Sequence, residues 1–238
     1  MYDPLEISSQ VESRIIKNSL NKKYYRIRGA KYYGGISTAD VVGCNMFCYF
    51  CWVHPKVRFN VQNVGQYYTP EQIGSKLVQI AQQANFHQLR ISGGEPTIGE
   101  AHLIELLKYL NDFPYNFILE TNGMLLSQKN YVKNLKNFNN LYVRISIKAC
   151  TPEMFSKVTG AISDAYYYPL RALELLIENE IACHPSIIID FCSKSEFQFF
   201  TQQLQQINPE LPDKLEYESL ILYPHVKKGL KKIGFLKD

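Results

Sequence analysis

The chain has 238 residues, of which 46% are hydrophobic and 20% are charged, and its formal net charge is +4. This length suits one domain with a full core or a single α/β barrel, and the composition is that of a globular protein. We find neither an apolar run long enough to cross a bilayer nor a secretory signal, which predicts a cytoplasmic protein without a membrane partner. The mild positive charge permits RNA or an acidic partner but argues for neither.

Helix and strand signals alternate along the chain. Residues 5–20 predict a helix, residues 22–33 form a basic, tyrosine-rich stretch, and a strand then ends at Val42. Thr69-Pro70-Glu71-Gln72 predicts a helix start with a capping box. Further predicted strands cover residues 88–92, 115–120, 141–147, 186–191 and 215–222. The predicted helices cover residues 70–84, 100–110, 127–137, 169–179 and 195–207, with another starting at Thr151.

Six strands separated by helices predict an α/β fold with parallel strands inside and helices outside. Six units over this length favour a partial (βα)6 TIM-like barrel over a full eight-stranded one, which needs about 250 residues. A doubly wound open sheet is the alternative. We expect a short N-terminal helical extension at 1–33, the barrel at 34–226 and a basic C-terminal tail at 227–238. In both architectures the reactive residues lie after the strands, at their carboxyl ends.

Three cysteines follow the first predicted strand with the spacing C-x3-C-x2-C: Cys44, Cys48 and Cys51. A [4Fe–4S] cluster normally takes four thiolates, so three leave one iron open to another ligand. Their crowding into one loop favours metal binding in a reducing cytosol over a disulfide scaffold. The alternative is a Cys3His zinc site completed by His54, whose spacing is feasible.

The other three cysteines, Cys150, Cys183 and Cys192, are scattered along the chain. Isolated cysteines usually behave as small buried hydrophobes, so we do not expect them to form a second cluster.

Polar motifs follow the other predicted strands. They are Gly93-Gly94-Glu95-Pro96, Glu120-Thr121-Asn122-Gly123, Ser146-Ile147-Lys148, Asp190 with Cys192, and Tyr223-Pro224-His225. Strand ends often carry Gly, Asn and Pro for structural reasons alone. Their coincidence with the cysteine triplet favours a shared active-site rim.

The cysteine loop with Phe50, followed one strand later by Gly-Gly-Glu-Pro, resembles the radical S-adenosylmethionine (SAM) superfamily across about residues 36–229. The resemblance implies an oxidoreductase with a [4Fe–4S] cluster and SAM as cofactors. Cys44, Cys48 and Cys51 would hold three irons, and the fourth iron would take the amino and carboxylate groups of SAM. One electron would then cleave SAM into methionine and a 5′-deoxyadenosyl radical that abstracts hydrogen from a substrate. A zinc site would not explain the Gly-Gly-Glu-Pro motif.

The same resemblance implies the contacts made by the remaining site residues. Phe50 would lie near the adenine, and Gly93, Gly94 and Glu95 would meet the methionine amino end. Glycine is suited to that position because a missing Cβ lets backbone approach a ligand closely.

Within the superfamily, three segments are similar to the activating enzyme of pyruvate formate-lyase. They are Leu-Glu-Thr-Asn-Gly at 119–123, Ser-Ile-Lys at 146–148 and Tyr-Pro-His-Val-Lys-Lys-Gly at 223–229. The similarity implies that Glu120, Asn122, Ser146, Lys148 and His225 contact the ribose, the methionine carboxylate or the adenine. Glu120 and Ser146 stand where that enzyme has Asp, and the histidine lies one residue closer to its proline.

By this similarity the reaction would be the activation of a protein glycyl radical, and the electron donor would be an external flavodoxin- or ferredoxin-like protein. A tRNA- or RNA-modifying enzyme is the alternative, because the basic tail contains Lys227, Lys228, Lys231 and Lys232. The sequence does not predict the substrate itself, the fate of SAM or the oligomeric state.

Overall fold

The computed structural model describes residues 1–237, and within them nine strands form one sheet. Its order is β1-β2-β3-β5-β6-β7-β8-β9, with β4 paired beside β2. The strands are β1 (Ile16–Lys17), β2 (Asn21–Ala30), β3 (Ile36–Val41), β4 (Gln66–Tyr68), β5 (Gln88–Gly93), β6 (Asn116–Thr121), β7 (Leu141–Ile147), β8 (Ala182–Ile188) and β9 (Glu216–Glu218).

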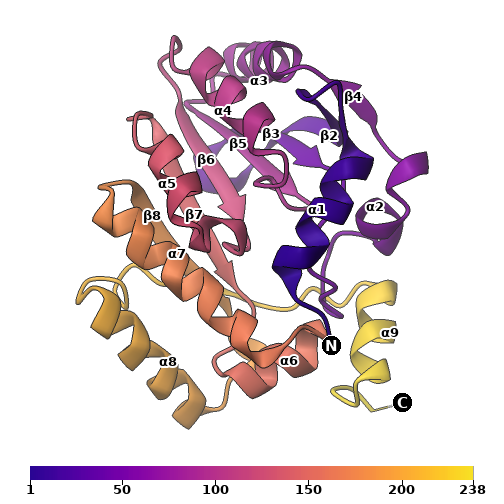
Figure 1. Cartoon of the computed structure of the whole chain (residues 1–238), viewed down its shortest axis with the longest axis vertical. Coiled ribbons are helices and arrows are strands. Elements are labelled where there is room, and N and C mark those ends of the chain that lie inside the picture. Colours follow the sequence, from indigo (N-terminus) through magenta and orange to yellow (C-terminus); the bar gives the residue numbers. More distant parts are fainter. Residues whose placement is uncertain (238) are drawn as a thin grey trace.

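Six strands, β3 and β5 to β9, pair in parallel, whereas β1, β2 and β4 pair antiparallel. Helices lie around the outside of the curved sheet (Figure 1). The helices are α1 (Pro4–Ile15), α2 (Pro55–Phe59), α3 (Pro70–Ala84), α4 (Glu100–Leu110), α5 (Lys129–Leu135), α6 (Pro152–Thr159), α7 (Tyr167–Glu178), α8 (Lys194–Ile207) and α9 (Pro224–Lys232). The predicted α/β fold, a partial TIM-like barrel, is confirmed.

The hydrophobic core lies between the sheet and its helices. In β7, for example, the alternate residues Leu141, Val143, Ile145 and Ile147 are buried in it, as the sequence pattern predicts. Because side chains alternate along a strand, the opposite face of the central strands points into the barrel, where Arg90, Glu120 and Arg144 line a cavity. The inside of the barrel thus carries charged side chains together with a small apolar cluster of Ala30, Ile36 and Ile118.

Local signals explain several helix ends. The capping box of Thr69 and Gln72 is formed, and the Thr151 side chain caps α6 by accepting from the amide of Met154. Ser127 does not cap α5, which begins two residues later, because its hydroxyl bonds the Met124 carbonyl instead. Among the helices of residues 1–237, none combines the length and apolar character needed to span a bilayer.

The N-terminal prediction of one helix over residues 5–20 is wrong for its last five residues. α1 ends at Ile15, and Asn18 and Ser19 adopt positive φ angles of 51° and 64°, which turn the chain into β2. The basic, tyrosine-rich stretch is mostly this strand, antiparallel to β3. The division of the chain into 1–33, 34–226 and 227–238 remains a proposal.

The last two predicted strands also have different bounds. β8 begins at Ala182, and residues Ile189–Phe191 form a 3-10 turn instead of its end. β9 spans only three residues, and the chain then continues without regular structure to Pro224. Part of the basic tail is helix α9, whose Val226 and Leu230 are fully buried.

Candidate active site

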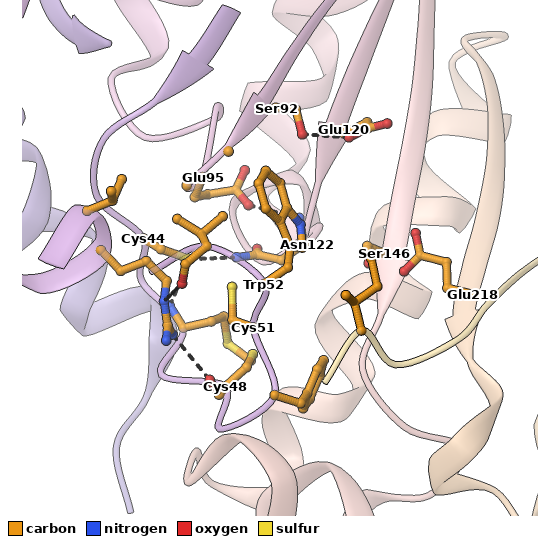
Figure 2. A pocket seen from close by; sticks show the side chains of 18 of the residues that line it. Cys44, Cys48, Cys51, Trp52, Ser92, Glu95, Glu120, Asn122, Ser146 and Glu218 are labelled. Atoms are coloured by element: carbon orange, nitrogen blue, oxygen red, sulfur yellow. Dashed lines mark hydrogen bonds between the residues drawn. The ribbon is translucent and has the colours of Figure 1, made fainter. Parts of the chain in front are cut away.

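A cavity of about 710 Å³ lies at the carboxyl ends of the strands and along the inner face of the sheet. Figure 2 shows the cysteines grouped at one end of it and Ser146 and Glu218 on another wall. The twelve site residues predicted from the sequence all line this cavity: Cys44, Cys48, Phe50, Cys51, Gly93, Gly94, Glu95, Glu120, Asn122, Ser146, Lys148 and His225. Their contacts with a cofactor remain predictions.

The backbone of the cysteine loop is held by groups from distant parts of the chain. The amide of Phe47 donates to the Tyr2 hydroxyl at 2.6 Å, and the amide of Tyr49 donates to the Val158 carbonyl at 3.0 Å. The buried Arg58 donates to the carbonyls of Val53 and Cys48. These bonds satisfy a loop that has no regular secondary structure of its own and fix where its thiols lie.

Gly229 of α9 packs directly against the cysteine loop. A Cβ built on Gly229 would lie 2.1 Å from the Tyr49 carbonyl oxygen, so only glycine permits this approach. His225, one turn earlier on the same helix, has its Nε2 3.2 Å from the Cys51 carbonyl oxygen. Helix α9 thus closes the outer side of the loop.

The Gly-Gly-Glu-Pro turn is bonded to the strand end that leads into the cysteine loop. The amide of Gly94 donates to the Val41 carbonyl at 2.9 Å, and the amide of Glu95 donates to the Gly43 carbonyl at 2.8 Å. A Cβ on Gly94 would meet the Gly43 oxygen at 1.9 Å. The second glycine is therefore required by contact between two backbones within the protein.

The Glu95 carboxylate organises the neighbouring strand end. Its Oε1 accepts from the Thr97 amide and from the hydroxyls of Thr97 and Thr121, and its Oε2 accepts from the Asn122 amide at 2.8 Å. Glu95 is only 1% exposed, and these donors offset the cost of burying its charge. In this arrangement Glu95 fixes the turn and Asn122.

Asn122 connects the strand end to the cysteine loop and the N-terminal helix. Its Nδ2 donates to Asn45 Oδ1 at 2.7 Å and lies 3.9 Å from the Cys44 sulfur. Asn45 in turn donates to the Ser8 hydroxyl of α1 at 2.9 Å. Nothing in the spacing of the motifs indicated Asn45 or Ser8, which are both buried polar residues.

The remaining predicted polar residues lie on successive strands. Glu120 accepts from Arg90 at 2.9 Å and from the Ser92 hydroxyl at 2.6 Å, and Figure 2 shows the second of these bonds. Lys148 donates to the Ser146 hydroxyl at 2.8 Å. Glu120 is thus partly neutralised, whereas Lys148 faces the cavity with a hydroxyl as its partner.

Phe50 lines the cavity, and its ring packs against that of Phe191 at a centroid distance of 4.7 Å. It is 6% exposed and belongs to the main hydrophobic cluster. The pair supplies an apolar wall beside the cysteines.

Burial raises the pKa of the Cys48 thiol to about 11 and raises that of Cys44 further. Such thiols become thiolates only when a strong positive charge, such as a coordinated metal, compensates for the burial. Within residues 1–237, no three His, Cys, Asp or Glu side chains converge on one point that would hold a single ion. His54 uses its Nδ1 to accept from the Lys56 amide and cap α2. The role of His54 as the cap of α2 argues against its being a zinc ligand.

Two of the scattered cysteines are not isolated. Cys150 and Cys192 form a disulfide, so the expectation that both are free buried thiols is wrong, whereas Cys183 is free. The bond joins the loop after β7 to the loop after β8. The two cysteines are 42 residues apart, and the connectivity of cysteines cannot be deduced from their spacing alone.

Residues 40–193 match the family model of the radical SAM superfamily, which is more than half of the chain. The chain belongs to the radical SAM superfamily. A probable GTP 3′,8-cyclase of Thermococcus kodakarensis is 32% identical over 117 residues, covering 49% of this chain and 36% of that protein. This radical SAM chain spans between a third and about half of the length of the curated GTP 3′,8-cyclases that it matches.

Solved structures share the radical SAM fold at low sequence identity. HydG, a maturase of [FeFe]-hydrogenase, superposes with a TM-score of 0.61 and 14% identity over 97% of this chain and 53% of its own. SuiB of Streptococcus suis, bound to SAM, gives a TM-score of 0.54 and 14% identity over 83% of this chain and 48% of its own. The predicted superfamily is confirmed, and with it a [4Fe–4S] cluster and SAM as its cofactors. The relatives are named as GTP 3′,8-cyclases. That reaction differs from the one of the pyruvate formate-lyase activating enzyme, which the segments at 119–123, 146–148 and 223–229 resemble.

The residues present fit these cofactors. Three thiols on one tethered loop face a shared cavity, and a cluster distributes its cysteines over separate irons, so the thiols need not converge on one point. Beside them lie backbone of the Gly-Gly-Glu turn and the polar side chains of Asn122 and Lys148.

Proposed function

We propose that this radical SAM enzyme holds a [4Fe–4S] cluster through Cys44, Cys48 and Cys51 and abstracts a hydrogen atom from a polar substrate in the same cavity. When bound, the cluster supplies one electron that cleaves SAM into methionine and a 5′-deoxyadenosyl radical. The observation that carries the proposal is the meeting of the cysteine loop, the Gly-Gly-Glu turn and the polar strand ends around one cavity of about 710 Å³.

In this proposal the side chains and backbone of the cavity bind SAM and orient it. Gly93 and Gly94 present backbone to the methionine amino end, and Glu95 holds that turn by its four accepted hydrogen bonds. Lys148 offers a positive charge for a carboxylate, and Phe50 an apolar wall for the adenine.

Glu120, Asn122, Ser146 and His225 complete the proposed cofactor contacts. Glu120 lines the cavity, and Arg90 and Ser92 each hold one of its carboxylate oxygens. His225 lines the cavity with its Nε2 near the Cys51 carbonyl. A pre-ordered site of this kind loses less entropy when its cofactor binds.

The charged lining favours a polar substrate. Four arginines of the sheet, Arg26, Arg28, Arg90 and Arg144, face the cavity. A protein glycyl radical site would have to insert a loop among these charges, and a tRNA base would have to leave its stack. GTP, for which the curated relatives are named, is one candidate among polar molecules.

The test is anaerobic reconstitution with iron and sulfide, followed by addition of reductant and SAM. We expect about four iron and four sulfide per chain and formation of 5′-deoxyadenosine. Dithionite and a flavodoxin- or ferredoxin-like protein are compared as electron donors. An intact cluster with strong reductant and no 5′-deoxyadenosine would overturn the proposal, as would one zinc without sulfide.

Matched cysteine variants control the test. Cys48→Ala is expected to lose both the cluster and the product. Cys183→Ala removes a free cysteine on β8 that lies outside the lining of the cavity, and is expected to retain both. A substrate screen then compares GTP, a glycyl-radical protein and tRNA by deuterium transfer into 5′-deoxyadenosine.

A further inference from the structure

The arginines inside the barrel are not equally neutralised. On the central strands, Arg90 pairs with Glu120 at 2.9 Å. On the β9 side, Arg144 pairs with Glu216 at 2.8 Å and also contacts Glu218. On these walls each guanidinium is therefore matched by at least one carboxylate.

The β2 wall carries an excess of positive charge. Arg26 Nε lies 2.6 Å from Asp40 Oδ2, and Arg28 Nη2 lies 3.6 Å from the same oxygen. Two guanidinium groups thus share one carboxylate. The Nε of Arg28 is buried and has no hydrogen-bond partner among the described residues. Asp40 Oδ1 is buried and unpaired among these residues as well, so the contact of Arg28 with Asp40 is the looser of the two, and the accessible part of its guanidinium is left to bind a further acceptor.

The pair is accessible and oriented. The side chains of Arg26 and Arg28 are 39% and 30% exposed, whereas that of Asp40 is fully buried, and both arginines line the cavity. The Arg26 guanidinium lies over the rings of Tyr25 and Trp52, 5.5 Å and 5.7 Å from their centroids. Stacking on two aromatic rings restricts its orientation before any ligand arrives.

The other cations of the cavity are engaged elsewhere. Arg58 donates to the Val53 and Cys48 carbonyls and so holds the cysteine loop. Lys148 bonds Ser146, and in the proposed function it faces the carboxylate of SAM. The charge left for a second ligand is on β2.

We propose that Arg26 and Arg28 bind an anionic group of the substrate, either a carboxylate or a phosphate. This assignment rests on the proposed function only in calling the ligand the substrate. Guanidinium groups bind planar oxyanions through paired, charge-assisted hydrogen bonds, which are stronger where water is partly excluded. The anion binds at the β2 edge, beside the proposed cofactor site and separate from it.

The test uses the cluster-loaded protein with SAM, titrated by calorimetry under anaerobic conditions at low ionic strength. The probes are inorganic phosphate, pyrophosphate and succinate. Trp52 is the single tryptophan of the sequence and adjoins Arg26, so its fluorescence gives a second, local readout. We expect saturable binding of at least one probe with a change in that fluorescence. The stronger class of probe identifies the anion as phosphate or carboxylate.

Variants assign the binding to the pair. Arg28→Gln and Arg26→Gln are each expected to weaken binding about tenfold or more, the effect of losing one charged hydrogen bond. Arg28→Lys keeps the charge without the planar fork and is expected to be intermediate. Arg171→Gln removes an exposed arginine of α7 and is expected to bind as the wild type does.

Equal affinity in the wild type and both glutamine variants would overturn the assignment, as would no binding of any probe to the wild type. Cluster content and substrate-independent formation of 5′-deoxyadenosine are measured in the same samples. Loss of those signals in the wild type counts against the proposed function, whereas their retention with no anion binding counts against the β2 site alone. Thermal unfolding of each variant separates lost binding from lost folding.

Discussion

The amide of Glu95 donates a 2.8 Å hydrogen bond to the carbonyl oxygen of Gly43, the residue immediately before Cys44. With the bond from Gly94 to Val41, this makes the Gly-Gly-Glu-Pro turn and the start of the cysteine loop one backbone unit. Two motifs that are separate in the sequence therefore depend on each other for their position.

Replacing Gly94 by alanine is expected to push the Gly-Gly-Glu-Pro turn away from the start of the cysteine loop. The new Cβ would lie 1.9 Å from the Gly43 oxygen, so one backbone must move, at a cost of about 3 kcal/mol or more. We predict a lower free energy of unfolding and a lower iron content after reconstitution. Gly34→Ala is the control for iron content, since no atom lies within 4 Å of its built Cβ, while its positive φ costs alanine about 1–2 kcal/mol of stability. Equal iron content in Gly94→Ala and wild type would contradict the prediction.

Replacing Glu95 by glutamine tests the carboxylate that fixes Asn122. One of its two oxygens becomes an amide that faces hydrogen-bond donors, so at least one buried donor loses its acceptor. We expect the free energy of unfolding to fall by about 1–3 kcal/mol, measured by urea denaturation. Glu105→Gln, in an exposed ion pair with Lys108, should change it by less than about 1 kcal/mol. If the two variants lose the same stability, Glu95 is not the anchor described.

His102 gives stability a pH dependence. Burial and the nearby charge of Lys22 lower the pKa of His102 to about 3, while its ring contacts the Tyr24 hydroxyl and the Leu20 carbonyl. Between pH 6.5 and pH 3 the unfolded chain binds a proton at this residue that the folded chain does not. Stability therefore falls as the pH is lowered through that window, by about 1.4 kcal/mol per pH unit.

The measurement is urea unfolding of wild type and His102→Gln at pH 5 and pH 6.5. We predict that wild type loses about 2 kcal/mol more than the variant over this interval. His87→Gln, at an exposed position, should follow the wild type. Parallel pH profiles for wild type and His102→Gln would show that the ring is not buried in its neutral form.

The disulfide between Cys150 and Cys192 should stabilise the folded chain. Closing a loop between residues 42 apart is worth about 4 kcal/mol in the chain-entropy model. We expect dithiothreitol to lower the melting temperature of the wild type towards that of a Cys150→Ser/Cys192→Ser double variant, whose own value stays constant. Cys183→Ser should still respond to the reductant. Six titratable thiols in the unreduced, cluster-free protein would contradict the bond.

The sequence alone predicts the order of the βα units and the rim on which the motifs gather. Apolar residues such as Leu141 and Val143 alternate with polar ones, which predicts a strand with one face on an apolar core. The twelve site residues gather in one cavity because parallel strands bring their carboxyl ends to a common edge.

β2 could not be predicted in the same way. Its charged residues Arg26 and Arg28 resemble a solvated segment when read alone, but they face an internal cavity beside Asp40. The sequence pattern also does not predict which distant groups form hydrogen bonds. Examples are the bonds from Asn45 to Ser8 and from Phe47 to Tyr2. Both bonds depend on how the chain returns to the cysteine loop.

Helix α9 has a consequence for the order of events during synthesis. Gly229 is in contact with Tyr49, and the Tyr2 hydroxyl accepts a hydrogen bond from the Phe47 amide. The cysteine loop is therefore held by residues that lie far from it on both sides in the sequence. While the ribosome is still translating the segment that becomes α9, the loop has no cover on that side. We therefore expect iron and sulfide to be inserted only after the α9 segment has been synthesised and has packed against the loop.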